Sequence, residues 1–413
     1  MKMLRNCTDF PIEKFNQMVK GYIADGYPGT LEPVQDYQAF KDAYPVMDKS
    51  MLAASGKQLL AAGKMHGCYI VSTSGTTNGP VILANKFLHG VTPDSYPYQV
   101  RAAMAEHVFT SDDIVANLLT AGGMGNSYEG MCRLLESIGV TILPVGRPDV
   151  LSNDALLLEL LKRFCVDVLV GSPSGIVQLA QAARRAGVTL AIRKIVFVGE
   201  AFHHAKRQFV REQWPLASFY SIYGTTELGF AAINTPLMSA DEHLILSDWF
   251  FMEISDEGAL LVTDLKAPVV PLIRYKIGDF GELLSTAGSR EFYLRIGGRV
   301  GEEFSLGGHR ISLDQIRKQL AHAGLDSSYC QVTLSSCQLG RDRVAVALDL
   351  PGGEVNEAVQ SHVESVLSQI PKIGEALRRG VAELHVVGRE HFQFNARQKL
   401  PAVRDQRHCA GAV

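Results

Sequence analysis

The pattern of apolar and polar positions between about residues 67 and 235 predicts strands and helices in alternation. The apolar run "DVLV" (167–170) is bounded by turn residues, and "SGIVQLAQAARRAG" (174–187) then places apolar residues at helical spacing. The segment "RKIVFVG" (193–199) reads as a strand again. Such an order predicts parallel strands covered by helices, with the loops at the strand ends available for a ligand.

The pattern changes to short strands and turns between residues 258 and 311, which predicts a smaller β-rich subdomain. Within this stretch, "RIGGRVGEEFSLGGHRI" (295–311) holds five glycines in seventeen residues, and we expect a flexible junction there. Ser312 and Gln315 follow at capping-box spacing and predict the start of a helix.

Beyond the junction, strand-like runs "YCQVTL" and "RVAVALDL" lead to a predicted helix near 354–369 and a predicted strand near 381–387. These elements predict a small α+β domain of their own. The chain of 413 residues is also too long for one ordinary core. We therefore predict an α/β protein with a large N-terminal domain of helix-covered mixed sheets (1–298) and a small mobile C-terminal domain (299–413).

Composition and charge limit the classes of partner. The formal net charge of −3 argues against a nucleic-acid binder held by a broad basic field, and no apolar run is long enough to cross a bilayer. The N-terminal "MKMLRNCTDFPIEKF" has no apolar core of a secretory signal. Seven scattered cysteines without a Cys-x-x-Cys pair indicate reduced thiols and argue against a cysteine-ligated zinc. We expect a cytoplasmic protein, monomeric or homodimeric, that binds neither nucleic acid nor membrane.

The stretch "VSTSGTTNGP" (71–80) follows an apolar run and combines hydroxyls with glycines. Glycines let backbone N–H groups approach an anion, and Ser and Thr hydroxyls add donors suited to phosphate oxygens. The missing Gly-Lys-Ser/Thr excludes a Walker-type loop. The alternative interpretation is a polar surface turn.

Three further segments carry candidate chemistry. In "FYSIYGTTELGF" (219–230), Glu227 beside two hydroxyls suits Mg²⁺ and a nucleotide, or is a solvated glutamate in a turn. In "PLIRYKIGDFGEL" (271–283), Asp279 could accept hydrogen bonds from a ribose, or is an ordinary turn aspartate. The basic stretch 378–408 contains Lys399, and a stretch of this composition most often forms a solvated surface.

The order and spacing of these segments resemble the adenylate-forming superfamily of acyl-CoA synthetases, luciferase and peptide-synthetase adenylation domains. "STSGTTNGP" resembles its phosphate loop, "YGTTE" its Tyr-Gly-x-Thr-Glu motif, "RYKIGD" its Tyr-(Arg/Lys)-x-Gly-Asp motif, and "GGRVGEEFSLGGHRI" its hinge. The landmarks "YPVMDKSML", "GNSYEG", "GSPSG" and "VGEAF" are similar to those of the phenylacetate-CoA ligase branch. The likeness covers roughly residues 40 to 404. That branch includes enzymes that activate aryl acids, phenazine carboxylates among them, in antibiotic biosynthesis.

The resemblance implies a set of nucleotide contacts, with ATP and Mg²⁺ as cofactors. The phosphate loop would hold the β- and γ-phosphates, one turn would line the adenine site, Tyr223 would pack on the base, Thr226 would contact the α-phosphate and Glu227 would hold Mg²⁺. Asp279 would bind the ribose near Arg299. The phosphate loop would consist of Ser74, Gly75, Thr76 and Thr77. The adenine turn would consist of Gly199, Glu200 and Ala201. Gly224 and Thr225, in the "YGTTE" motif, would also contact the nucleotide.

For the acid, the resemblance implies that Lys399 bridges the carboxylate and the α-phosphate, and that Tyr128, Phe230 and Ala231 line the acyl pocket. Aromatic and small apolar residues suit a flat aryl acid, although core packing explains Phe230 equally well. The sequence departs from the family at Asn78 and Val81 in the phosphate loop, at Gly301 where the hinge acid is expected, and around Lys399.

The resemblance thus implies ATP-dependent activation of a small-molecule carboxylic acid to an acyl-adenylate, followed by transfer to the thiol of CoA or of a phosphopantetheinyl carrier protein. A second reading is adenylation alone, with transfer of the acyl group to a carrier protein or partner enzyme. A third is a non-catalytic nucleotide-binding protein that retains the fold, for which the altered hinge and final motif are the only support.

Overall fold

The computed structural model describes residues 2–4, 10–73, 81–85, 92–148, 154–239, 241–286, 291–299, 303–325, 330–349, 355–393 and 402–407. The chain forms two compact units, each assembled from separate stretches of sequence. Unit 1 consists of Met1–Asp112, Thr120–Thr141 and Phe219–Val300, and unit 2 consists of Asp113–Leu119, Ile142–Ser218 and Gly301–Val413.

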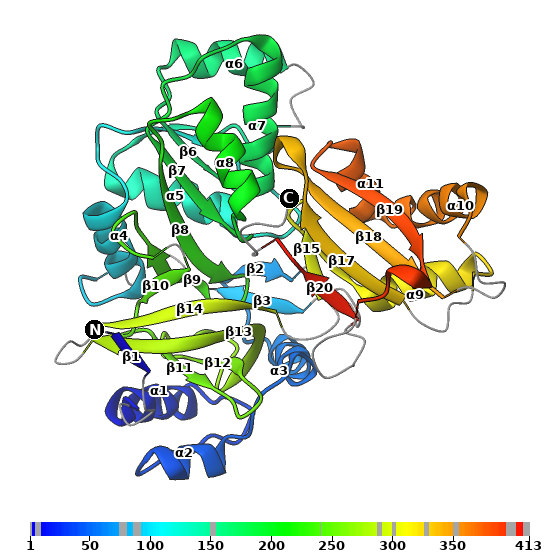
Figure 1. Ribbon diagram of the computed structural model, residues 1–413. Helices are drawn as coiled ribbons and strands as arrows, with labels where there is room; N and C mark the ends of the chain where they lie inside the picture. The colour runs from blue at the N-terminus through cyan, green and yellow to red at the C-terminus, as the bar shows by residue number, and fades with distance from the viewer. Residues whose placement is uncertain are drawn as a thin grey trace. The chain divides into compact units, whose positions relative to one another are not determined.

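An antiparallel sheet organises unit 1 (Figure 1). Its long strands β13 and β14 pair through most of their length, and β13 alternates buried and part-exposed side chains from Tyr275 to Phe280. This alternation places Tyr275, Ile277 and Asp279 on one face. The strands in spatial order are β11 (Phe250–Ile254), β12 (Ala259–Asp264), β13 (Tyr275–Thr286), β14 (Phe292–Arg299), β10 (Glu242–Ile245), β9 (Gly229–Asn234) and β8 (Ser218–Thr225), with β1 (Lys2–Leu4) on β13.

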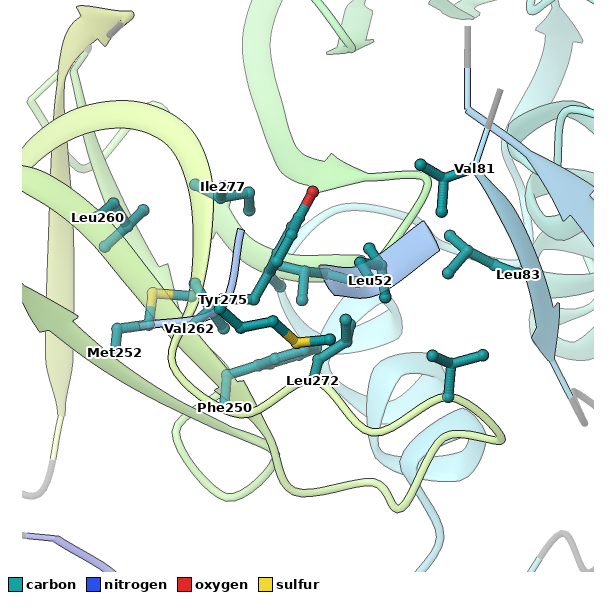
Figure 2. Close-up of a cluster of buried hydrophobic side chains, with 14 of the residues drawn as sticks. Leu52, Val81, Leu83, Phe250, Met252, Leu260, Val262, Leu272, Tyr275 and Ile277 are labelled. Atoms are coloured by element: carbon teal, nitrogen blue, oxygen red, sulfur yellow. The ribbon is translucent and has the colours of Figure 1, made fainter. Parts of the chain in front are cut away.

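The main core of unit 1 lies against this sheet. Apolar residues of β11, β12 and β13 pack with Leu52, Val81 and Leu83, and Tyr275 lies among them with its hydroxyl directed away from Met252 and Leu272 (Figure 2). A second cluster is rich in aromatic rings, such as the stacked pair Phe10–Phe40. The other elements of unit 1 are α1 (Ile12–Ala24), α2 (Tyr37–Ala43), α3 (Lys49–Ala61), β2 (Tyr69–Ser72), β3 (Ile82–Asn85), α4 (Tyr96–His107) and α5 (Ser127–Ile138).

In unit 2, the strands β4 (Ile114–Asn117), β6 (Val168–Gly171) and β7 (Lys194–Val198) are parallel neighbours. All four residues of β6 are buried, as expected for a parallel strand with both faces covered. The helices associated with them are α6 (Asp154–Arg163), α7 (Pro173–Ala186) and α8 (His204–Gln213), and β5 (Thr141–Leu143) falls where the chain passes from unit 1 into unit 2.

The rest of unit 2 is an α+β assembly whose sheet and helices share one hydrophobic core (Figure 1). Ser312 and Gln315 form the predicted capping box at the start of α9. Its elements are the hairpin β15 (Glu303–Leu306) and β16 (His309–Ser312), the sheet β19 (Ala382–Gly388), β18 (Asp342–Leu348), β17 (Cys330–Ser336) and β20 (Val403–Asp405) in that order, the helices α9 (Leu313–His322), α10 (Glu357–Ser368) and α11 (Pro371–Arg378), and the 3₁₀ turns η1 (Gln338–Gly340) and η2 (Arg389–His391).

The predicted alternation of strands and helices is confirmed by β6, α7 and β7, and the predicted helix and strand after residue 354 by α10 and β19. Part of the predicted flexible junction is regular structure, and its flexibility stays a prediction. Residues 303–312 form a hairpin, and Gly307 and Gly308 turn it with φ values of 57° and 86°, which side chains other than glycine rarely adopt. The boundary between residues 298 and 299 stays a prediction. Within the described ranges, no helix is long and apolar enough to span a membrane.

Candidate active site

The turn between β8 and β9 presents Glu227. Thr225 pairs with Gly229, so residues 226–228 close the hairpin. A Cβ on Gly224 would lie 2.2 Å from the Gly229 carbonyl oxygen, which explains the glycine in this motif. Leu228 is 1% exposed and its N–H donates to Thr225 Oγ1 (3.3 Å). The turn is therefore anchored through Leu228, while Glu227 is only half-buried.

Two tyrosines join this hairpin to β13. Tyr275 Oη donates to Glu227 Oε1 (3.3 Å), and Tyr223 Oη donates to Asp279 Oδ2 (2.7 Å). Tyr275 and Asp279 lie on the same face of β13, so one strand face reaches both the tip and the stem of the hairpin. The two sequence motifs that contain Glu227 and Asp279 therefore come together in unit 1.

The two tyrosine donors at this site are neutral hydroxyls, so these two hydrogen bonds bring no positive charge to the carboxylates. Asp279 is 4% exposed and lies opposite Arg299 in the β13–β14 ladder. Only the backbone of Arg299 is described, so its predicted role near a ribose stays a prediction. A carboxylate of this kind can accept further hydrogen bonds or coordinate a cation.

His243 lies next to the stem of the hairpin. Its Nε2 is 3.0 Å from Ser221 Oγ, and its ring centroid lies 6.1 Å from that of Tyr223. Burial lowers the pKa of His243 to about 4. The imidazole is therefore neutral near pH 7 and brings no positive charge to the site.

The predicted phosphate-loop residues Ser74, Gly75, Thr76 and Thr77 lie outside the described residues, as does Asn78. The ends of the loop are described. Thr73 N–H donates to the Val81 carbonyl oxygen (3.0 Å), and Val81 N–H donates to Thr73 Oγ1 (3.1 Å), so the β2–β3 hairpin is closed where the loop begins. Val81, where the sequence departs from the family motif it resembles, is 2% exposed in the core.

The predicted acyl-pocket residues come from two elements. Tyr128 lies in α5 after a turn in which Gly122, Gly123 and Met124 all have positive φ, and the Met124 carbonyl oxygen accepts a hydrogen bond from Ser72 N–H (2.9 Å). Burial raises the pKa of Tyr128, so the hydroxyl stays protonated. Phe230 and Ala231 lie in β9, where Ala231 is fully buried in the core. Their contact with an acid stays a prediction.

The predicted adenine turn Gly199–Ala201 lies in unit 2, directly after β7. Gly199 has a φ of 85°, and both Gly199 and Ala201 are exposed at the carboxyl end of a parallel strand, a common ligand position in such sheets. The Glu200 side chain turns inward, where its Oε2 accepts from Ser174 Oγ (2.7 Å).

Glu200 belongs to a buried charge cluster in unit 2, defined by Glu200, Lys206, Asp342, Asp405 and Arg407. Lys206 Nζ lies 2.8 Å from Asp342 Oδ2 and 3.8 Å from Glu200 Oε2. Arg407 lies 3.2 Å from Asp342 and pairs with Asp405 at 2.6 Å. The side chains of Lys206, Asp342 and Arg407 are 1%, 0% and 3% exposed, so this is an interior network.

Arg407 contradicts the expectation that the basic C-terminal stretch is a solvated surface, because its guanidinium is buried between carboxylates. Burial alone would raise the pKa of Asp405, but the hydrogen bonds and charge of Arg407 lower it to about 2. Lys399 lies outside the described residues, as does Gly301. Their predicted roles stay predictions.

Sequence reasoning missed the tyrosine that holds Glu227 and two side chains beside the hairpin, Tyr96 and Lys266. Tyr275 lies in "RYKIGD", but this motif alone predicts no contact with Glu227. Tyr96 lies 134 residues from the backbone group that it contacts, so no local pattern reveals it. The charged pair in "LLVTDLKAPVV" was the available signal for Lys266, since a buried charge inside an apolar run requires a partner.

The AMP-binding enzyme family matches this chain over residues 29–247, just over half of its length. The chain belongs to the AMP-binding enzyme family. Indoleacetate–lysine synthetase of Pseudomonas savastanoi is 26% identical over 378 residues, which are 90% of this chain and 92% of that protein. Phenylacetate-coenzyme A ligase of Pseudomonas putida is 25% identical over 218 residues, about half of each chain (49% and 47%).

Solved structures agree on the fold of this AMP-binding enzyme. A 2-hydroxyisobutyryl-CoA ligase in complex with 2-HIB-AMP and CoA matches with a TM-score of 0.66 at 18% identity, covering 95% of this chain and 88% of that one. The amide bond synthetase of Marinactinospora thermotolerans matches with a TM-score of 0.54 at 16% identity, covering 80% and 67%. At these identities the likeness concerns the fold.

These findings confirm the predicted adenylate-forming superfamily and its phenylacetate-CoA ligase-like branch, together with the mixed α/β fold. The protein is an AMP-forming ligase that uses ATP to make an acyl-adenylate. The reading as a non-catalytic nucleotide-binding protein is therefore not supported.

Proposed function

We propose that this ligase activates an aryl acid with MgATP through a site that contains Glu227 and Asp279, releasing pyrophosphate. The observation that carries the proposal is the pairing of two motif carboxylates with tyrosines along one face of β13. A carboxylate at a hairpin tip and a second one beside its stem match the two needs of a bound nucleotide, a metal at the phosphates and an acceptor for the ribose hydroxyls.

The residues present suit magnesium. Within the described ranges, no cluster of three or more His, Cys, Asp or Glu side chains could hold a metal by itself. Mg²⁺ is typically bound by one or two carboxylates together with substrate phosphates, and Glu227 is a half-buried carboxylate oriented by a neutral donor. Glu227 would hold the ion, which would neutralise charge on the phosphates.

The chemistry of adenylation explains the remaining assignments. A carboxylic acid is a poor acyl donor because oxide would have to leave, so its oxygen attacks the α-phosphorus and pyrophosphate departs with the electron pair of the broken P–O bond. The step gathers negative charge, and catalysis depends on positioning and charge neutralisation. We assign Thr226 and Lys399 to the α-phosphate, residues 74–77 to the departing phosphates, and the domain 299–413 to the delivery of Lys399.

Support for an aryl substrate comes from the relatives and from the pocket residues. The names of the relatives give indoleacetate and phenylacetate, which are both aryl acids with a short acid arm. Tyr128 follows a glycine-rich turn at the start of α5, and Phe230 is the second residue of β9. A planar ring would pack against such aromatic and glycine-rich surroundings.

For the acyl acceptor, we propose a thiol, either CoA or a phosphopantetheinyl carrier protein. CoA is supported by the names of the phenylacetate-coenzyme A ligases and by the CoA-bound ligase structure. A second candidate is an amine, which would give an amide. One observation favours it: the relative that matches nine-tenths of this chain is named for joining indoleacetate to lysine.

Two assays on the full chain test this proposal. The first is ATP–pyrophosphate exchange with a panel of aryl and alkyl acids, for which we expect exchange with aryl acids such as phenylacetate and indoleacetate. The second supplies the accepted acid with CoA, phosphopantetheinyl carrier protein or lysine, and identifies the product by mass spectrometry. Exchange with alkyl acids alone would refute the aryl assignment, and a product formed only with lysine would replace the thiol by an amine.

A further inference from the structure

Two side chains outside the family motifs contact the backbone that follows Glu227. Lys266 Nζ donates to the Leu228 carbonyl oxygen (2.7 Å), and Tyr96 Oη donates to the Phe230 carbonyl oxygen (2.6 Å). Lys266 follows β12 and Tyr96 begins α4, so two distant elements of unit 1 converge on three consecutive residues of the hairpin.

Lys266 and Tyr96 also contact each other. The Lys266 ammonium lies 4.5 Å from the centroid of the Tyr96 ring and 3.9 Å from that of Phe250, in the geometry of a cation–π contact. Its charge is paired with Asp264 at 2.8 Å. We call Lys266, Asp264, Tyr96 and Phe250 the hairpin clamp.

The clamp acts at the start of β9, which pairs with β8 but precedes the residues paired with β10. The pairs between β9 and β10 join Ile233 and Ala232 to Leu244 and Ile245, and the Ala231 carbonyl oxygen accepts from Leu246 N–H (3.0 Å). The Leu228 and Phe230 carbonyls precede this paired segment, and side chains supply their donors. Tyr96 also restricts which side chain fits at position 229, between the two carbonyls, because a Cβ on Gly229 would lie 3.2 Å from Tyr96 Oη.

Burying the Lys266 ammonium beside β9 costs desolvation free energy, so we ask what this group contributes that an apolar side chain could not. Burial lowers the pKa of Lys266 and raises that of Asp264, while their mutual attraction opposes both shifts. A buried ion pair is often no more stabilising than apolar residues of the same volume. What Lys266 supplies that an apolar residue cannot is an N–H donor for the backbone directly after Glu227.

We propose that Lys266 and Tyr96 are positioning residues of adenylation, which fix the start of β9 and thereby hold the Glu227 carboxylate toward the metal-bearing phosphates. The clamp fixes the backbone that follows Glu227, and Tyr275 orients the Glu227 carboxylate by a hydrogen bond. This inference rests on the proposed role of Glu227, and the experiment below separates the two.

The test uses Tyr96→Phe, which removes one hydroxyl and keeps the ring over Lys266. Its matched control is Tyr44→Phe, which removes a hydroxyl that also donates to a backbone carbonyl at 2.6 Å, that of Glu32, in the aromatic cluster of unit 1. Hydrogen exchange is measured on peptides covering residues 225–231, and ATP–pyrophosphate exchange is measured as a function of Mg²⁺ concentration.

We expect Tyr96→Phe to speed exchange of the hairpin amides and to raise the Mg²⁺ concentration for half-maximal activity about three- to tenfold, as one lost hydrogen bond implies. Activity at saturating Mg²⁺ should change little, and Tyr44→Phe should change neither quantity. The double variant Lys266→Met/Asp264→Asn, which removes the ion pair without leaving one charge alone, should show a larger shift of the same kind.

Wild-type hairpin exchange and a wild-type Mg²⁺ requirement in Tyr96→Phe would overturn the inference. Glu227→Gln separates it from the proposed function. If Glu227→Gln keeps the wild-type Mg²⁺ requirement, the metal role of Glu227 is wrong, and any loosening of the hairpin in Tyr96→Phe has no bearing on metal binding. If Glu227→Gln shifts the requirement and Tyr96→Phe does not, the metal role stands and the positioning role is wrong.

Discussion

The hairpin site of unit 1 and the buried charge cluster of unit 2 treat their carboxylates in opposite ways. Glu227 and Asp279 accept hydrogen bonds from tyrosine hydroxyls, which bring no charge. Glu200 and Asp342 lie beside Lys206, and Asp342 also faces Arg407, so their charge is compensated inside the protein. Both regions come from segments that carry family motifs or flank them.

This difference indicates which of the two motif glutamates, Glu227 or Glu200, is suited to contact bound MgATP. The hydroxyl that contacts Glu227 is neutral, and this half-buried carboxylate can coordinate a cation. The Glu200 side chain instead lies inside the protein, where it contacts Ser174 and Lys206. We therefore assign metal binding to Glu227. For the turn 199–201 we expect backbone contacts to adenine, with the Glu200 side chain acting as a structural anchor.

The largest effect should follow from breaking the unit 2 cluster. Asp342→Ala leaves Lys206 and Arg407 without their shared buried partner, so the free energy of unfolding should fall by about 3–5 kcal/mol. Urea unfolding of the full chain measures it. The control Asp314→Ala breaks the exposed pair with Lys318 and should cost less than about 1 kcal/mol. Equal effects of the two variants would refute the structural role of the cluster.

Lys399→Ala should slow adenylation about 10²- to 10³-fold, the usual loss when one aimed donor is removed from such a site, while ATP still binds. ATP–pyrophosphate exchange measures the rate, and calorimetry with ATP measures binding. Lys372→Ala is the control, because that ammonium donates to the Arg310 carbonyl oxygen and has no assigned catalytic role. Wild-type turnover in Lys399→Ala would remove this residue from the mechanism.

Acid should weaken the two regions in different pH windows. The pKa of His243 is lowered from 6.5 to about 4, so the folded state binds fewer protons than the unfolded one, and stability present above pH 6.5 is lost as pH falls toward 4. The loss amounts to roughly 2–3 kcal/mol. In unit 2, the pKa of Asp405 is lowered from 3.8 to about 2, so its contribution is lost only below about pH 4.

Hydrogen exchange from pH 7 to pH 3, corrected for intrinsic rates, measures this separation. Peptides around His243 should lose protection before those around Asp405, and His243→Gln should remove the step between pH 6.5 and 4 near His243. Loss of protection around both residues over one shared window, unchanged in His243→Gln, would contradict this assignment of the titrating groups.

The smallest effect concerns the stem of the hairpin. Tyr223→Phe removes the hydroxyl that donates to Asp279, so the carboxylate is less well oriented, and the KM for ATP should rise about tenfold. Steady-state exchange kinetics measure it. Tyr37→Phe removes a similar bond to Glu253 (2.6 Å) and should leave the KM unchanged. An unaltered KM in Tyr223→Phe would separate Asp279 from nucleotide binding.

Much of the fold was predictable because regular strands and helices leave a clear local pattern of apolar and polar residues in the sequence. The runs that became β6 and β7 are apolar and short, and the capping box at Ser312 marks its helix directly. The hairpin of residues 303–312 was not predicted, since its glycines also fit a flexible junction. Gly307 and Gly308 serve a tight turn instead.

The candidate site was predictable only as far as motifs extend. The pairing of Tyr223 with Asp279 joins residues 56 positions apart, and the contact of Tyr96 with Phe230 joins residues 134 apart. Such contacts depend on how β13 and α4 pack around the hairpin, which no local pattern contains. The inward position of Glu200 has the same origin, because its partner Ser174 comes from another helix.

The most direct test of the central claim is the Mg²⁺ dependence of ATP–pyrophosphate exchange in Glu227→Gln and Glu200→Gln. Glu227→Gln should need at least about tenfold more Mg²⁺ for half-maximal exchange, because the substitution removes the one protein carboxylate assigned to the Mg²⁺ ion. Glu200→Gln should keep the wild-type requirement. A wild-type Mg²⁺ requirement in Glu227→Gln, or a shifted one in Glu200→Gln alone, would contradict the account.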